Sequence, residues 1–312
     1  MRRSASVSAV SQRRRAALPV LVMIIVLAIA LAFLSPRILM PQNLLNILNQ
    51  QASLVAVTIG QTFVILTGGL DLSVGSVVSL TTAILSHNAA WSLPAALAAA
   101  LAVGLVNALG ITRFGIHPIL MTLSTMTAVQ GLALIVRPVP GGEVAGWLTA
   151  YGSGKLFGVV PLPILAALIL VVGVSYVLGR TCFGLHVYAT GASQESARLG
   201  GVNATRIVVS VYLLSSLFAC LGGINVAGRL ASGDPLVGVP FSVDSIAATA
   251  LGGTMLSGGM GGILGPIGGV LFLALLGNGL NFLNVSTYYQ MIIKGVLLIL
   301  AVSAHRRSTP GL

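Results

Sequence analysis

The chain has 312 residues, of which 56% are hydrophobic and only 7% are charged, and its formal net charge is +11. A soluble domain carries roughly a quarter of charged residues, so this composition excludes one, and no segment is long and polar enough to form a second, soluble domain. Apolar stretches of about 18 residues or more recur along the sequence, and we expect an all-α, polytopic transmembrane helical bundle.

The positive charge gathers at the two ends of the chain. The residues that carry it there are Arg2, Arg3, Arg13, Arg14, Arg15, Arg306 and Arg307. Because positive residues favour the cytoplasmic side of a membrane, we expect both termini to be cytoplasmic. No basic surface is interleaved with aromatic residues, so we expect no nucleic-acid partner. The tails are residues 1–15 and 305–312, and the transmembrane domain is 16–304.

We expect ten membrane crossings. Their approximate limits are Ala16–Leu34, Ala52–Leu66, Ser73–Leu85, Leu93–Ile111, Pro118–Val136, Pro163–Leu178, Ile207–Ala227, Ile246–Leu256, Ile263–Phe282 and Tyr288–Val302. The first run is longer than a usual secretory signal core and no A-x-A site closes it, so it stays as a helix of the mature chain. A short interfacial helix over Met40–Gln51 precedes the second crossing.

The predicted loops agree with the charge rule, with four positive residues in outside loops as exceptions: Arg37, Arg137, Lys155 and Arg229. Arg113, Arg180, Arg198 and Arg206 fall in predicted inside loops, and Glu143, Asp234 and Asp244 fall in predicted outside loops. The longest outward loop is 137–160, where Trp147 and Tyr151 are either membrane-interface anchors or docking residues for an outside partner. Cys182 and Cys220 lack any metal or redox spacing, so we expect free thiols and no metal site.

A glycine-rich break interrupts the apolar sequence between the second and third crossings, and it contains Asp71, one of five acidic residues in the chain. A carboxylate and a broken backbone at membrane depth are tolerated where they face protein or a cavity. We therefore expect a gate or substrate path here. Its candidate residues are Thr67, Gly68, Gly69, Asp71, Ser73 and Gly75. For Asp71 itself, the alternative is a structural carboxylate that caps the next helix.

A second glycine-rich break lies at 258–262, and the segment 252–259 is a faint echo of 68–75. Paired broken segments in two halves of a chain are typical of transporter binding sites. After this break, Gly261, Gly265 and Gly269 recur every four residues and predict close helix packing. Further along lie Asn278, Asn281 and Asn284. These amides are suited either to sugar hydroxyls, which makes Asn278 and Asn281 candidates for the path, or to bonds between helices.

The inside loop 180–206 contains a second informative stretch. Ser193 is placed to cap a short helix that carries Glu195, Ala197, Arg198 and Leu199. Such a helix on the cytoplasmic face suits docking into a groove of another protein, although a solvated loop fits the composition equally well.

At this point the chain resembles a known family, the membrane permease subunits of bacterial ATP-binding-cassette sugar importers of the ribose/xylose/autoinducer-2 type. The break GGLDLSVGS is similar to the family motif G-G-[IL]-D-L-S-V-G-S, and YATGASQESARLGGV at 188–202 is similar to A-x-G-x-N-x-x-A-A-R-L-x-G-I. Ser193 and Gln194 stand where the family has Gly-Asn, and Ser196 replaces Ala. The likeness extends from Pro41 to Ala304 and includes GPIGGVLFLALLGNGLNFL.

The resemblance implies a multi-pass permease of the bacterial inner membrane that pairs with itself or with a related second permease chain in the lipid. Two ATP-binding subunits would dock on its cytoplasmic side, and an extracytoplasmic substrate-binding protein would deliver a sugar. The coupling residues it implies are Glu195, Ser196, Ala197, Arg198, Leu199 and Gly200. The chain has no G-x-x-x-x-G-K-[ST] loop, so we expect it to bind no cofactor and ATP to sit on the partner.

Two alternatives remain. One is a permease of the same type for another small solute, such as an amino acid or a nucleoside. The other is a proton- or sodium-coupled secondary transporter, for which only Asp71 is a good ion-binding candidate. An intramembrane enzyme is disfavoured, because neither H-E-x-x-H nor a nucleophile paired with His or Asp occurs in the spans.

Overall fold

The computed structural model describes residues 19–33 and 36–304. The described part is almost entirely helical. Its elements are helix Pro19–Phe33, η1 Pro36–Leu39, α2 Pro41–Leu66, α3 Val74–Leu85, α4 Ser92–Thr112, α5 Pro118–Val136, α6 Gly146–Ser153, β1 Lys155–Leu156, β2 Val160–Pro161, α7 Leu162–Arg180, α8 Cys182–Ala192, α9 Gln194–Leu199, α10 Ala204–Leu230, α11 Val239–Leu251, α12 Leu264–Phe282 and α13 Thr287–Ala304. The strands β1 and β2 pair antiparallel. The predicted tails, 1–15 and 305–312, lie outside the described residues.

Within residues 19–33 and 36–304, five helices are long and apolar enough to cross a membrane, namely α4, α5, α7, α10 and α12. This confirms the predicted all-α membrane bundle. By contrast, α3 has 12 residues and α11 has 13, and at 1.5 Å per residue each spans only about 20 Å of the roughly 30 Å hydrocarbon core. These two short helices adjoin the two glycine-rich breaks, so each break stands where a helix stops partway through the membrane.

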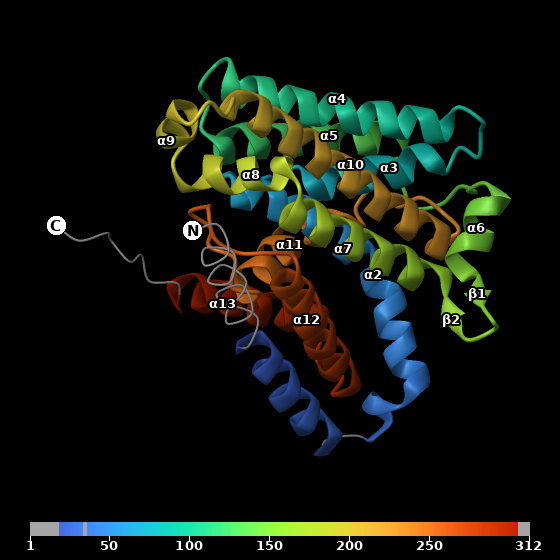
Figure 1. Ribbon diagram of the computed structural model, residues 1–312. Coiled ribbons are helices and arrows are strands. Elements are labelled where there is room, and N and C mark those ends of the chain that lie inside the picture. The colour runs from blue at the N-terminus through green and yellow to red at the C-terminus, as the bar shows by residue number, and fades with distance from the viewer. Residues whose placement is uncertain (1–18, 34–35, 305–312) are drawn as a thin grey trace.

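Helix α2 forms the centre of the bundle (Figure 1), with α10 packed on it from one direction and α11 and α12 from another. Every residue of α2 from Ala52 to Leu66 is buried. Glycine lets the neighbours approach this closely: a Cβ at Gly60 would lie 2.9 Å from the Cα of Ser215 on α10. Close backbone packing of this kind stabilises helices in lipid, where the hydrophobic effect does not drive them together.

The prediction of a separate interfacial helix before the second crossing is wrong. A single helix, α2, begins with Pro41 at its first position and continues without interruption to Leu66. Proline suits the start of a helix, and the Asn and Gln residues that follow change the polarity of the segment without breaking its backbone. The change in composition therefore marks no change in structure.

The predicted limits of the eighth crossing are also wrong. Helix α11 begins at Val239, next to Pro240, and ends at Leu251, where Gly252 and then Gly253 (φ +78°) stop it. Asp244 lies inside α11 rather than in an outward loop, and its Oδ2 is 2.7 Å from the Nζ of Lys294 on α13. The ion pair explains how a carboxylate can lie within an apolar helix.

Helices α11 and α12 pack as the spaced glycines predict. A Cβ at Gly265 would lie 1.9 Å from the Gly252 carbonyl oxygen, and one at Gly269 would lie 2.0 Å from that of Ala248. These two glycines therefore pack helices together. Gly261 precedes α12 and has φ +141°, so it belongs to the break and not to the helix face.

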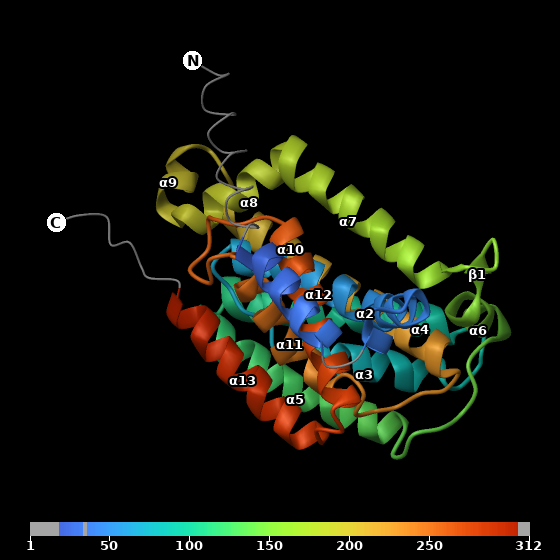
Figure 2. The same ribbon diagram turned by 90° about the horizontal axis from the view of Figure 1, so that it is seen from below.

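The two ends of the molecule carry different structures (Figures 1 and 2): α6 and the β1–β2 hairpin lie at one end, and α8 and α9 lie at the other. The predicted outward loop 137–160 contains a helix, because its apolar run forms α6, which packs on α10. Tyr151 donates to Asn225 Oδ1 at 2.5 Å, and burial raises the pKa of its hydroxyl, which keeps it protonated as the donor. Of the two aromatic residues proposed for docking, Tyr151 therefore packs inward.

Candidate functional site

The first break starts where α2 ends. Thr67 donates its hydroxyl to the Val64 carbonyl at 2.8 Å, and Gly68 follows with φ +82°, a backbone conformation that favours glycine. Thr67 and Gly69 are buried, whereas Gly68 is exposed. The break therefore presents backbone rather than side chains at Gly68.

The carboxylate of Asp71 accepts several of the hydrogen bonds that hold the break. It is fully buried, and its Oδ1 accepts hydrogen bonds from the backbone N–H of Ser73 (3.0 Å) and from the Ser73 hydroxyl (2.6 Å). Its Oδ2 accepts from Ser215 of α10 at 2.8 Å. With the Gln61 amide oriented to satisfy both of its atoms, its nitrogen donates to the Asp71 carbonyl (2.9 Å) and its oxygen accepts from the Asp71 N–H (3.2 Å). Ser73, not Asp71, occupies the N-cap position of α3, so Asp71 holds the cap residue instead of being it.

Polar residues from two further helices extend this network. Asn107 of α4 donates to the Ser73 hydroxyl at 2.9 Å. The N–H of Gly75 donates to Ser242 of α11 at 3.2 Å, and that hydroxyl donates to the Leu72 carbonyl at 2.7 Å. No sequence pattern connects Asn107, Ser215 or Ser242 with the break, because each lies in a different helix far along the chain from Asp71. Together they fix the shape of the broken backbone.

The two breaks meet in space. The N–H of Gly259 donates to the Leu66 carbonyl at 3.0 Å. A Cβ at Gly68 would lie 3.3 Å from the Ser257 carbonyl oxygen. The segments that echo one another in sequence are therefore one continuous structural unit, and Gly68 lies at the contact.

The asparagines of α12 make bonds between segments. Asn278 and Asn43 of α2 bond through their amides, with Nδ2 of Asn43 3.0 Å from Oδ1 of Asn278. Asn281 accepts from Gln290 of α13 at 2.7 Å and is exposed. Asn284 follows α12 with φ +55° and is also exposed. The amide of Asn278 is therefore used for bonding between helices. Asn281 also accepts one such bond, but its side chain remains exposed.

The predicted short helix is present as α9, which follows directly after the end of α8. Ser193 caps it by accepting the N–H of Ser196 at 3.1 Å. Ala197 is buried and anchors the helix, whereas Leu199 is 86% exposed and Glu195, Ser196, Arg198 and Gly200 are exposed as well. A hollow of about 310 Å³ adjoins α9 and is lined by Arg198, Val202 and Asn203 among others. Charge, an exposed leucine and a hollow thus lie together on one small surface.

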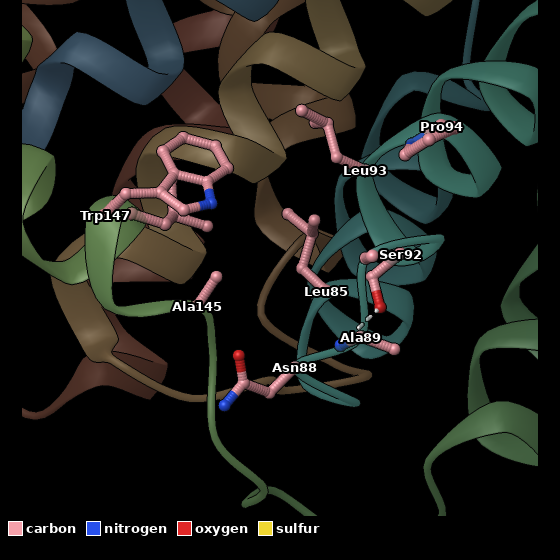
Figure 3. Close-up of a pocket in the computed structure, with 10 residues that line it drawn as sticks. Leu85, Asn88, Ala89, Ser92, Leu93, Pro94, Ala145 and Trp147 are labelled. Atoms are coloured by element: carbon pink, nitrogen blue, oxygen red, sulfur yellow. Dashed lines mark hydrogen bonds between the residues drawn. The ribbon is translucent and has the colours of Figure 1, made fainter.

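The opposite end carries a larger pocket of about 560 Å³ between the α3–α4 turn and the start of α6 (Figure 3). Trp147 stands on one side of the pocket, Asn88 lies at its edge, and Leu85 and Leu93 line the facing wall. An indole and an amide over an apolar floor can hold a side chain of a docking protein.

Comparison with known proteins places the chain in a family. The profile of the family described as "Branched-chain amino acid transport system / permease component" matches residues 43–302. The ribose import permease of Bacillus subtilis is 37% identical, with 91% of each chain covered, and that of Escherichia coli K12 is 38% identical, with 90% of this chain and 91% of the other covered. The L-arabinose permease of Azospirillum brasilense is 31% identical over 91% of this chain and 85% of its own. No solved structure matches. The chain therefore belongs to this family of inner-membrane permease subunits of ATP-binding-cassette transporters, which confirms the resemblance to the sugar importers.

Proposed function

We propose that this chain is the permease subunit of an importer that moves a neutral sugar across the bacterial inner membrane by ATP-driven alternating access. The observation that carries the proposal is the break at 67–73, whose buried polar groups are hydroxyls and amides around one satisfied carboxylate. The relatives that this chain resembles are named for ribose, L-arabinose and D-allose.

A neutral cargo fits the charges among the membrane helices. Of the five acidic residues, only Asp71 and Asp244 lie there. Asp71 accepts hydrogen bonds from Ser73 and Ser215, and Asp244 is paired with Lys294. An amino acid would bring two charges into this region and would need partners of opposite charge. Hydroxyl-rich cargo needs only donors and acceptors such as those of Asn281.

The gate in this proposal is the joined pair of breaks. Gly68 supplies its exposed surface, while Thr67, Gly69, Asp71, Ser73 and Gly75 set its shape from within. Asn278 and Asn281 lie on α12, which follows the second break, and Asn281 is the better placed to meet cargo because it is exposed. A second permease chain, identical or related, would complete the path in the lipid.

Coupling to ATP is assigned to α9. Two ATP-binding subunits, which carry the ATP, would receive α9 through Glu195, Arg198 and the exposed Leu199, with Ser196, Ala197 and Gly200 shaping the helix. An apolar anchor flanked by charges is the usual form of a helix that docks in a groove. The hollow beside Arg198 would accept a side chain from the partner.

The pocket of about 560 Å³ beside Trp147, called the outer pocket from here on, is assigned to docking of the extracytoplasmic substrate-binding protein. It lies at the end of the molecule away from α9 (Figures 1 and 3) and is walled by Trp147. A half-exposed tryptophan beside a pocket is a typical anchor of a protein interface.

The test is uptake of labelled ribose into proteoliposomes that contain this chain, its ATP-binding subunits and its binding protein. ATP on the side of the ATP-binding subunits should drive accumulation, and omission of either partner should stop it. Parallel assays with labelled leucine and adenosine define the cargo, and preferential uptake of either would replace the sugar. Uptake driven by a proton gradient in vesicles that contain this chain alone would refute the ATP-driven mechanism and favour an ion-coupled transporter.

A further inference from the structure

Three backbone segments meet at one point near the end of the bundle that carries α8 and α9 (Figure 1). They are the end of α2, the second glycine-rich break and the end of α8. A Cβ at Gly191 of α8 would lie 1.8 Å from the Leu66 carbonyl oxygen and 2.6 Å from the nitrogen of Gly259. A Cβ at Gly258 would lie 2.8 Å from the nitrogen of Gly68 and 3.0 Å from the Gly191 carbonyl oxygen. The Gly259 N–H closes the junction through its bond to Leu66.

No side chain separates these three segments, and this determines how they respond to force. Side chains that change rotamer can absorb small shifts, whereas packed backbone cannot, since packed interiors transmit strain. A displacement of α8 at Gly191 therefore moves the end of α2 and the second break together. Gly258 and Gly259 have φ of +90° and +75°, so their backbone, too, is held in a conformation that other residues rarely adopt.

Helix α8 is joined directly to α9. Ser193 is both the residue that ends α8 and the residue whose hydroxyl caps α9. One turn before the end of α8, the Tyr188 hydroxyl donates to the Gly261 carbonyl at 3.1 Å, a second tie to the same break. The path from the exposed α9 to both breaks is thus a single turn of helix with no flexible linker.

We propose that Gly191, Gly258 and Gly259 form a joint that transmits movement of α9 to both breaks at once, so that the two breaks open as one gate. Tyr188 keeps α8 in register with the second break. These are positioning residues, since they act on the gate and do not touch cargo. The inference rests on the proposed function, because it requires that α9 is moved by the ATP-binding subunits.

The experiment measures coupling, which is the amount of sugar imported per ATP hydrolysed by the complete complex in proteoliposomes. Gly191→Ala inserts one methyl group into the joint, and Tyr188→Phe removes the hydroxyl that donates to Gly261. The controls are Gly173→Ala and Tyr176→Phe on α7. A Cβ at Gly173 meets no described atom within 4 Å, and Tyr176 is 65% exposed.

We expect Gly191→Ala to hydrolyse ATP at the wild-type rate while import per ATP falls about ten-fold or more, and Tyr188→Phe to show a smaller loss in the same ratio. Both controls should keep the wild-type ratio. A wild-type ratio in Gly191→Ala overturns the joint. If Gly191→Ala is absent from the membrane, Tyr188→Phe decides alone, and an unchanged ratio there overturns the proposal. Failure of the wild-type complex to import with ATP would instead count against the proposed function.

Discussion

The hydroxyl of Ser215, in the middle of α10, donates to Oδ2 of Asp71 at 2.8 Å and so ties the broken segment between α2 and α3 to the longest helix of the bundle. Both oxygens of the carboxylate accept bonds from serine, and no cation is among its hydrogen-bond partners in the described structure. A buried carboxylate held only by neutral donors acts by fixing the shape of the backbone around it. This relationship favours an architectural role for Asp71 over a direct role in binding cargo or ions.

Asp71→Asn should therefore be tolerated, whereas Asp71→Ala should not. Asparagine keeps an oxygen for the Ser73 donors, and the Ser215 hydroxyl can rotate to accept from the amide. Alanine takes the carboxylate acceptor away from the buried Ser73 and Ser215 donors, at about 1–3 kcal/mol for each unsatisfied group. Melting of the detergent-solubilised protein, followed by fluorescence, and import by the complex measure the two effects. Loss of import in Asp71→Asn with unchanged melting would show that the negative charge itself is required, as in an ion-coupled transporter.

Lys294→Ala should destabilise the packing of α13 on α11. The change leaves Asp244 without its partner at a site where the two side chains are only 25% and 14% exposed. We expect a loss of about 1–3 kcal/mol, less than the 3–5 kcal/mol typical of fully buried pairs, because both side chains are only partly buried. The double variant Asp244→Asn/Lys294→Gln should recover part of the loss. A double variant that is less stable than Lys294→Ala would contradict this account.

Arg198→Glu should abolish import while the chain remains inserted and folded. The change reverses the charge on the exposed face of α9, where the hollow lies, and does not touch the buried anchor Ala197. The complex should then show uncoupled or unassembled ATP-binding subunits, measured by co-purification and ATP hydrolysis. Arg113→Glu is the matched control, since this exposed arginine follows α4 in a turn at the same end of the molecule (Figure 1). Normal import by Arg198→Glu would refute the coupling role.

Trp147→Ala should weaken stimulation of ATP hydrolysis by the substrate-binding protein. The chain supplies its own control, because Trp91 and Trp147 are both 56% exposed but only Trp147 lines the outer pocket. Removal of an aromatic anchor typically costs about 2 kcal/mol or more at an interface, which corresponds to a roughly thirty-fold loss of apparent affinity. Titration of the binding protein against ATP hydrolysis measures it. Equal effects of Trp147→Ala and Trp91→Ala would exclude the pocket as the docking site.

The sequence predicted those features that depend on neighbouring residues. Apolar runs placed most of the helices, the glycines marked both breaks, and Ser193 marked the cap of α9. The family resemblance was also visible in two short motifs. Errors arose where polarity was read as a break in the chain. The amides after Pro41 continue α2, and Asp244 lies within α11 because Lys294, 50 residues away, compensates its charge.

By itself, then, the sequence determined that this is a helical membrane permease with two interrupted segments and a short helix capped by Ser193, since hydropathy, glycine and capping act over a few residues. Only the tertiary structure decided that the two interruptions touch each other and the end of α8, and that Asp71 is held by Ser215 and Asn278 by Asn43. Such contacts join residues that are far apart in the sequence. They arise from close helix packing in a medium where each buried polar group must find a partner within the protein.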